Sequence, residues 1–260
     1  MLLKVKRYRE AELPLLAAYQ LSKQTSELTT EQTLLKGQIT YKLGYIQQQN
    51  KNFEGALKYY NELIIPNDNH LMGIVYNSKA ECYNELKQID NAINSLRESI
   101  SIFENKINSY KDKENTEKET SSSKIMLAMS YNNLSGYYAE IEKYQEAREN
   151  ASKAVDLFQT ELGKHNDITK NAIINYVFLL QKLGDKETIN KLATNWESET
   201  KQAIEQLQEF GKQQLSKEDL ELTANKWKTL KELNPPGFLV PSTIFRKQKE
   251  SFGQFWKNQF

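Results

Sequence analysis

Two histidines and one cysteine are the residues of this chain best suited to metal binding or nucleophilic chemistry. His70 and His165 lie about 95 residues apart, and neither belongs to a spaced motif such as H-E-x-x-H, which places two ligands on one helix face. Cys82 stands beside Tyr83 in an apolar helical pattern, where a buried small residue is the expected role. The sequence therefore predicts no catalytic residue, no metal site and no cofactor.

Other signatures of catalysis are missing as well. The chain has no phosphate-cradling G-x-x-x-x-G-K-[ST], no G-x-G-x-x-G and no G-x-S-x-G elbow. Its carboxylates are interleaved with lysines, a pattern typical of solvated helix surfaces. We expect a protein that is not an enzyme.

Composition narrows the setting in which the chain works. The 260 residues carry a formal net charge of +1, which disfavours specific nucleic-acid binding. Hydrophobic residues make up 38% and the mean hydropathy is -0.72; no stretch is long and apolar enough to span a bilayer, so membrane contact is expected only through a complex. A single cysteine favours a reducing compartment. We expect a cytoplasmic protein, with a mitochondrial location inside a complex as the alternative.

The elements around these residues are predicted to be helices, because few prolines and glycines interrupt residues 32–233. One pattern returns within them: a large apolar residue stands three positions before an alanine. The four alanines are Ala11, Ala56, Ala92 and Ala147. A small residue at this point of a second helix allows close approach to the first helix of a pair. Twelve positions before the last three alanines stand the small residues Gly44, Ala80 and Ser135.

This pattern resembles the tetratricopeptide repeat (TPR), a helix-turn-helix unit of 34 residues. A fifth, degenerate copy has Leu183 and Gly184 before Ile189, so the resemblance covers roughly residues 2–200. It implies an all-α fold, a right-handed α-α superhelix or TPR solenoid. The alanines are 45, 36 and 55 residues apart, and such long steps resemble the kinesin-light-chain-like branch. Residues 108–123, poor in apolar side chains, are predicted to be a mobile loop. Ser121–Ser123 in it are either phosphate acceptors or mere linker.

The resemblance also implies a concave groove lined by the first helix of each repeat. Its expected side chains are Gln38, Tyr41, Tyr45 and Gln48; Asn77, Glu81 and Asn84; Asn132 and Asn133; and Asn171, Asn175, Phe178 and Gln181. Amides both donate and accept, so a ladder of them can hold the backbone of an extended peptide whatever its sequence. The alternative is that asparagine is simply abundant in this chain.

The two ends depart from the repeat. We expect a solenoid of four to five repeats over 1–200, the first incomplete because its first helix is missing, with capping helices over 201–233 and an extended tail over 234–260. A docked neighbour would cover the exposed edge; a truncated sequence or a short cap from Met1–Val5 are the alternatives. Pro14, inside the second helix of this incomplete repeat, should bend that helix or cost about 3 kcal/mol.

The tail carries aromatic residues that suit partner docking: Phe238, Phe245, Phe252, Phe255 and Trp256. It can instead pack on its own solenoid or contact a membrane or nucleic acid. From all this we expect a non-catalytic protein-protein interaction scaffold, an architectural or assembly subunit of a larger complex. The alternative is a soluble adaptor that captures an extended peptide in its groove.

Overall fold

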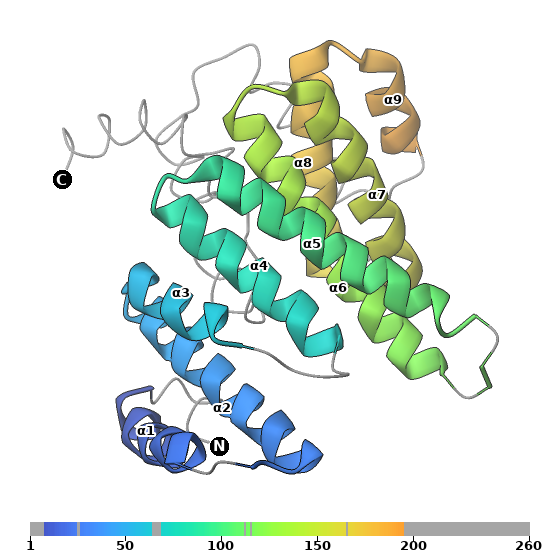
Figure 1. The fold of residues 1–260 in the computed structure, drawn as a ribbon. Helices are drawn as coiled ribbons and strands as arrows, with labels where there is room; N and C mark the ends of the chain where they lie inside the picture. Colours follow the sequence, from blue (N-terminus) through green and yellow to red (C-terminus); the bar gives the residue numbers. More distant parts are fainter. Residues whose placement is uncertain are drawn as a thin grey trace, which may run out of the picture. The chain divides into compact units, whose positions relative to one another are not determined.

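A computed structural model describes residues 8–24, 27–63, 69–111, 113–114, 116–164 and 166–194. These described residues form nine α-helices and no strand, which confirms the all-α prediction (Figure 1). The helices are α1 (Tyr8–Gln24), α2 (Thr30–Gln49), α3 (Phe53–Asn61), α4 (Asn69–Glu85), α5 (Ile89–Asn108), α6 (Glu117–Glu140), α7 (Tyr144–Leu162), α8 (Asp167–Leu183) and α9 (Lys186–Thr194). None of them is long and apolar enough to cross a membrane. The expected capping helices and tail lie outside the described residues.

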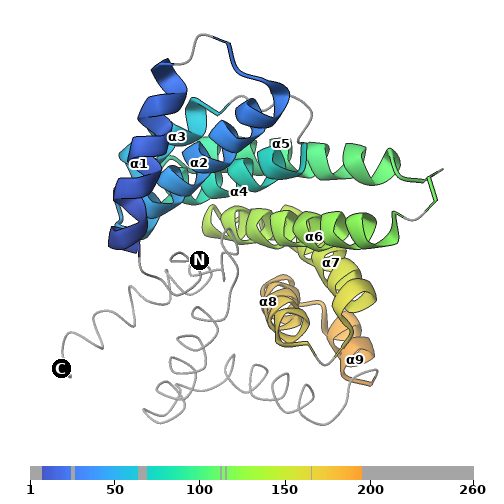
Figure 2. The same cartoon turned by 90° about the horizontal axis from the view of Figure 1, so that it is seen from below.

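The chain divides into two compact units, Met1–Glu114 and Asn115–Phe260. In the first unit, α2 pairs with α3 and α4 with α5, while α1 packs on α2 (Figure 2). In the second unit, α6 pairs with α7 and α8 with α9, and α7 also packs on α8. Each unit is therefore built from helical hairpins, as the repeated alanines predict.

The four hairpins share one turn. Lys51, Lys87, Glu142 and Gly184 have φ of 62°, 65°, 62° and 71°, and each stands five residues before Ala56, Ala92, Ala147 or Ile189. The N–H that follows each of them bonds to a carbonyl five residues back, as from Asn52 to Gln47 and from Asp185 to Leu180, both at 2.9 Å. This is the Schellman end of a helix. The shared geometry confirms the register, including that of the degenerate fifth copy.

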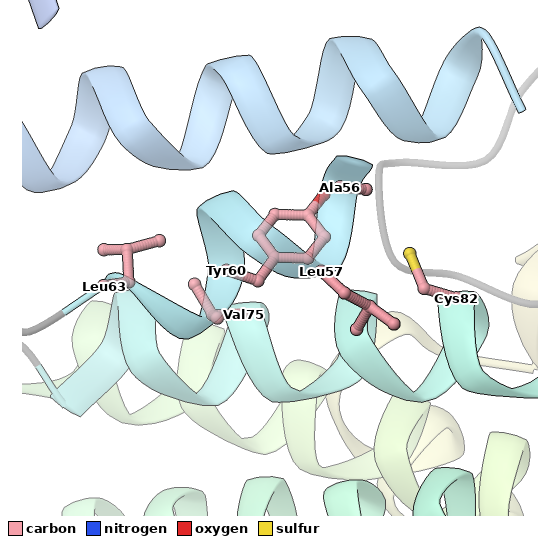
Figure 3. Close-up of a cluster of buried hydrophobic side chains, with 6 residues drawn as sticks. All are labelled: Ala56, Leu57, Tyr60, Leu63, Val75 and Cys82. Atoms are coloured by element: carbon pink, nitrogen blue, oxygen red, sulfur yellow. The ribbon is translucent and has the colours of Figure 1, made fainter. Parts of the chain in front are cut away.

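The repeat alanines mark where paired helices approach each other. Ala56, Ala92 and Ala147 are fully buried. On the facing helix α2, a Cβ added to Gly44 would lie 2.5 Å from the Tyr60 ring, so only glycine fits there. Figure 3 shows Tyr60 of α3 packed with Val75 and Cys82 of α4 in the cluster that joins the first two hairpins.

One expectation about a helix end is corrected. α6 begins at Glu117, so the loop predicted over residues 108–123 is wrong for its last seven residues, and Ser121–Ser123 are helical. The Lys124 ammonium lies 2.9 Å from the Glu161 carboxylate of α7, so the first turns of α6 are in contact with the next helix. α1 continues through Pro14, which lies inside a helix as expected.

Candidate interaction surfaces

The inner face of α2 carries an aromatic ladder. The Tyr41 and Tyr45 rings, one turn apart, are stacked with centroids 6.4 Å apart, and the Tyr60 ring lies 6.0 Å from that of Tyr41. Both ladder residues are half-buried, whereas Gln38, one turn before, is exposed. Burial raises the pKa of Tyr41 to about 12, although a hydrogen bond with Ser78 opposes the shift. Its hydroxyl therefore stays protonated near neutral pH and can donate a hydrogen bond.

Gln48 is buried and engaged within the first unit. The Tyr60 hydroxyl donates to its Oε1 at 2.7 Å, and its Nε2 donates to the Glu81 carboxylate at 2.5 Å. This chain of hydrogen bonds ties α3, α2 and α4 together. Of these three side chains, only the half-buried Glu81 retains some exposure at the predicted groove.

Asn77 is turned toward its own hairpin partner. It is buried, and its Nδ2 donates to Ser99 Oγ of α5 at 2.6 Å and to the Gly73 carbonyl at 3.3 Å. The structure thus assigns Asn77 to the α4–α5 contact and not to an open groove. Sequence reasoning missed this role because the small hydroxyl that receives the bond lies 22 residues further along the chain. Asn84 is also buried, and its Nδ2 has no hydrogen-bond partner.

In the second unit, the predicted groove asparagines are brought together but closed off. Asn132, Asn133, Asn171 and Asn175 are all at least nine-tenths buried. The Asn175 Nδ2 donates to Asn132 Oδ1 at 3.5 Å across α6 and α8. Three further amide atoms have no hydrogen-bond partner: Nδ2 of Asn132, Nδ2 of Asn171 and Oδ1 of Asn175. We call these three residues the amide cluster. Phe178 and Gln181 are half-buried at the next turns of α8.

A buried amide atom without a hydrogen-bond partner can gain stability from an added donor or acceptor. Leaving one such group without a partner costs about 1–3 kcal/mol, so an added donor or acceptor at the amide cluster would be stabilised. A peptide backbone offers both kinds of group. That the cluster binds a peptide remains a prediction.

The residues suited to catalysis do not converge within the described part of the chain. Cys82 is fully buried, and burial raises the pKa of its thiol far above the usual value, which confirms the expected role as a small buried residue. The His70 ring packs edge-on against Phe103, with centroids 5.5 Å apart, and His165 lies outside the described residues. The described residues include no group of three or more His, Cys, Asp or Glu side chains able to hold a metal ion.

The outer side of α1 and the start of α2 each carry exposed leucines, and sequence reasoning expected exposed apolar side chains at this end of the chain. Leu13 is 74% and Leu21 66% exposed, followed by Leu35 at 57% and Leu34 at 36%. Of the described residues, just one other large hydrophobic side chain, Leu183, is exposed. We call Leu13, Pro14, Ala17, Leu21, Leu34 and Leu35 the end face.

The other side of α1 is well anchored. Tyr19 is buried in a cluster with Ile39 and Leu43 of α2. Its hydroxyl donates to the Glu62 carboxylate, and the Lys23 ammonium lies 3.3 Å from the same carboxylate. This hydrogen bond, and next the neighbouring Lys23, lowers the pKa of Glu62 despite partial burial. The end face is thus held in place on a docked helix.

Comparison with known proteins agrees with this architecture. The model of the tetratricopeptide repeat family matches residues 74–106, within the α4–α5 hairpin. The crystal structure of BtubC (BKLC) from P. vanneervenii, a kinesin light chain-like protein, superposes with a TM-score of 0.54 at 14% identity. The match covers 76% of this chain and 72% of that one. At this identity the likeness shows the fold alone. No curated protein matches the sequence.

Proposed function

We propose that this chain, a tetratricopeptide repeat protein and thus a protein-protein interaction scaffold, serves as an architectural subunit of a larger assembly. The observation that carries the proposal is the end face. Inside a stack of repeats, a neighbouring helix covers the apolar side chains that a repeat helix turns outward. On α1 these outward leucines remain exposed. TPR proteins are generally non-catalytic, which is compatible with a scaffold role.

The energetics favour a lasting contact. Complete burial of an exposed leucine side chain contributes about 1.5–3 kcal/mol, and the end face offers four leucines in a single unit. Exposed large apolar side chains that gather on one part of a protein mark interaction sites. A surface that gains this much from being covered suits a permanent subunit contact better than a transient encounter.

The test compares which proteins remain bound to the full chain during purification from its native cells. Leu13→Glu with Leu21→Glu should remove the proteins that co-purify in fixed ratio, because a buried carboxylate is strongly unfavourable. The matched control, Gln49→Glu with Gln145→Glu, adds the same charge at exposed polar positions and should keep them. An unchanged set of proteins in the end-face variant would refute the proposal.

The C-terminal aromatic residues supply a second proposed contact. Phe238, Phe245, Phe252, Phe255 and Trp256 lie outside the described residues, and their docking role rests on the sequence. Deletion of residues 238–260 should reduce or abolish co-purification. Retained assembly would restrict the subunit contact to the end face.

The alternative function, an adaptor for an extended peptide, is favoured by the unpaired atoms of the amide cluster. Because these side chains are buried, a peptide lying along α6 and α8 would satisfy them through its backbone only once the asparagine side chains turn outward. Titration of the full chain with a peptide library should then show about micromolar affinity, lost on Asn171→Ala with Asn175→Ala. Unchanged binding would exclude the adaptor mechanism at these residues.

The compartment is part of the proposal. The single cysteine supports a reducing setting, and we place the protein in the cytoplasm, with mitochondria as the alternative. Microscopy of the tagged chain would distinguish the two.

A further inference from the structure

The amide cluster of the second unit presents a mixed set of unpaired atoms. Asn132, Asn171 and Asn175 are all at least nine-tenths buried. Nδ2 of Asn132 and Nδ2 of Asn171 are hydrogen-bond donors, whereas Oδ1 of Asn175 is an acceptor. None of these three atoms has a partner among the described residues. Two donors and one acceptor therefore remain to be satisfied in the buried contact between α6 and α8.

The three side chains lie together across the two helices. The Asn175 Nδ2 donates to Asn132 Oδ1 at 3.5 Å, so an amide of α8 is in direct contact with one of α6. Asn171 stands one turn before Asn175 on α8, and side chains four residues apart are neighbours on a helix. This arrangement suits a single small molecule that bridges the three amides.

The mixture of donors and acceptor restricts the chemistry of what can bind. A cation would attract Oδ1 of Asn175 but would be repelled by the N–H groups of Asn132 and Asn171, and an anion would be attracted by those groups but repelled by the oxygen. The molecule must therefore be neutral, and it must both accept and donate hydrogen bonds. Water meets this requirement.

Size separates water from the other candidate of the same chemistry. A peptide group also carries a donor and an acceptor, but it can reach the cluster only if the buried asparagine side chains turn outward. A water molecule needs no such movement. Burial of the three amides thus favours water as the occupant of the cluster in its closed form.

We propose that the amide cluster holds an ordered water molecule, which accepts hydrogen bonds from Asn132 and Asn171 and donates one to Asn175. Buried waters typically make about three hydrogen bonds to polar groups that lack other partners. Holding one water is less unfavourable than leaving several buried polar groups unpaired. The water is an additional link between α6 and α8, and the inference is independent of the end face.

Nuclear magnetic resonance of the full chain, labelled with isotopic asparagine, tests the proposal directly. Magnetisation from water should reach the side-chain NH₂ protons of both Asn132 and Asn171. The cross-peaks should have opposite signs in laboratory-frame and rotating-frame Overhauser spectra, as expected for a bound water and not for proton exchange. Asn132→Leu and Asn171→Leu each remove one pair of signals and so assign them. A lack of transfer to either side chain would overturn the inference.

The number of long-lived internal waters provides a second readout, measured by the relaxation of water oxygen nuclei. Changing Asn132, Asn171 and Asn175 together to leucine replaces the amides by apolar groups of similar size, and this variant should hold one long-lived water fewer than the native chain. Asn105→Leu, at an exposed position of α5, is the matched control and should leave the number unchanged.

Far-ultraviolet circular dichroism checks that both variants keep their helices, and the spectra of the native chain do not depend on whether the triple variant folds. A folded triple variant with the same number of long-lived waters as the native chain contradicts the inference. Neither result bears on the proposed function, because the co-purification test uses residues of the end face.

Discussion

The end face in the first unit exposes apolar side chains, whereas the amide cluster in the second unit buries polar atoms that lack hydrogen-bond partners. At the end face, leucines that would be buried elsewhere in a repeat stack remain exposed. At the amide cluster, polar groups that water would satisfy are buried, and three of their atoms have no partner. The first surface gains from any apolar cover, whereas the second gains only from groups that donate or accept hydrogen bonds. The comparison explains why we assign a subunit contact to α1 and reserve peptide binding for α6 and α8.

The largest expected effect on the free energy of unfolding is the difference between substituting a buried and an exposed leucine near α1. Leu43→Ala should lower the free energy of unfolding by about 2–5 kcal/mol, because Leu43 is fully buried against α1. Leu13→Ala should change it by less than about 0.5 kcal/mol. Urea denaturation of the monomeric chain measures both. Equal losses would mean that the end face is already covered within the chain.

The amide cluster should respond to single and paired changes differently. Asn132→Leu removes the acceptor of the Asn175 amide and should cost about 1–3 kcal/mol, because a buried donor then lacks a partner. Asn132→Leu with Asn175→Leu replaces both polar groups by apolar groups of similar size and should cost clearly less than the two single changes added together. A double-mutant cycle in urea gives the coupling. Strict additivity would show that the two amides do not interact.

The hairpin turns provide a smaller effect that both units should share. Lys87 and Glu142 adopt a left-handed conformation, which strains a residue with a Cβ by about 1–2 kcal/mol. Lys87→Gly or Glu142→Gly should therefore stabilise its own unit by roughly 0.5–1 kcal/mol once the backbone entropy of glycine is subtracted. Thermal denaturation of each variant gives the shift. Destabilisation by either change would contradict the shared turn.

The smallest effect concerns how firmly α1 is docked. The pKa of Glu62 is lowered in the folded chain, so its contribution is fully present above the unfolded value of about 4.3. The contribution is lost as the pH falls through the folded pKa. Since Glu62 is half exposed, we expect less than about 1 kcal/mol. Glu62→Gln should lower the melting temperature at pH 7 but not at pH 3, whereas Glu54→Gln, an exposed control, should do neither.

Much of the fold was predictable because the repeat is defined by the spacing of small and large apolar residues over short stretches of sequence. Alanines at a fixed distance from an aromatic or apolar residue located three of the four hairpins, and small residues such as Gly44 located the facing helix; Leu183 and Gly184 before Ile189 located the fourth. The turn residues Lys51 and Glu142 gave no local signal, because neither residue type favours a left-handed conformation. Their shared position becomes visible only when the hairpins are compared.

The interaction surfaces were less predictable because burial depends on residues distant in the sequence. Asn77 belongs to the α4–α5 contact through Ser99, and the amide cluster is closed off where an open groove was expected. The first turns of α6 contact α7 through the ion pair between Lys124 and Glu161, a contact between residues 37 apart in the sequence.

Site-specific photo-cross-linking in native cells tests the central claim most directly. A benzoylphenylalanine at Leu13 should become linked to another polypeptide, either a second copy or a different protein, while the same probe at the exposed Gln145 should not. Linkage of the Leu13 probe only within its own chain, or no linkage at either position, would contradict the claim that this protein is built to be covered at its α1 end.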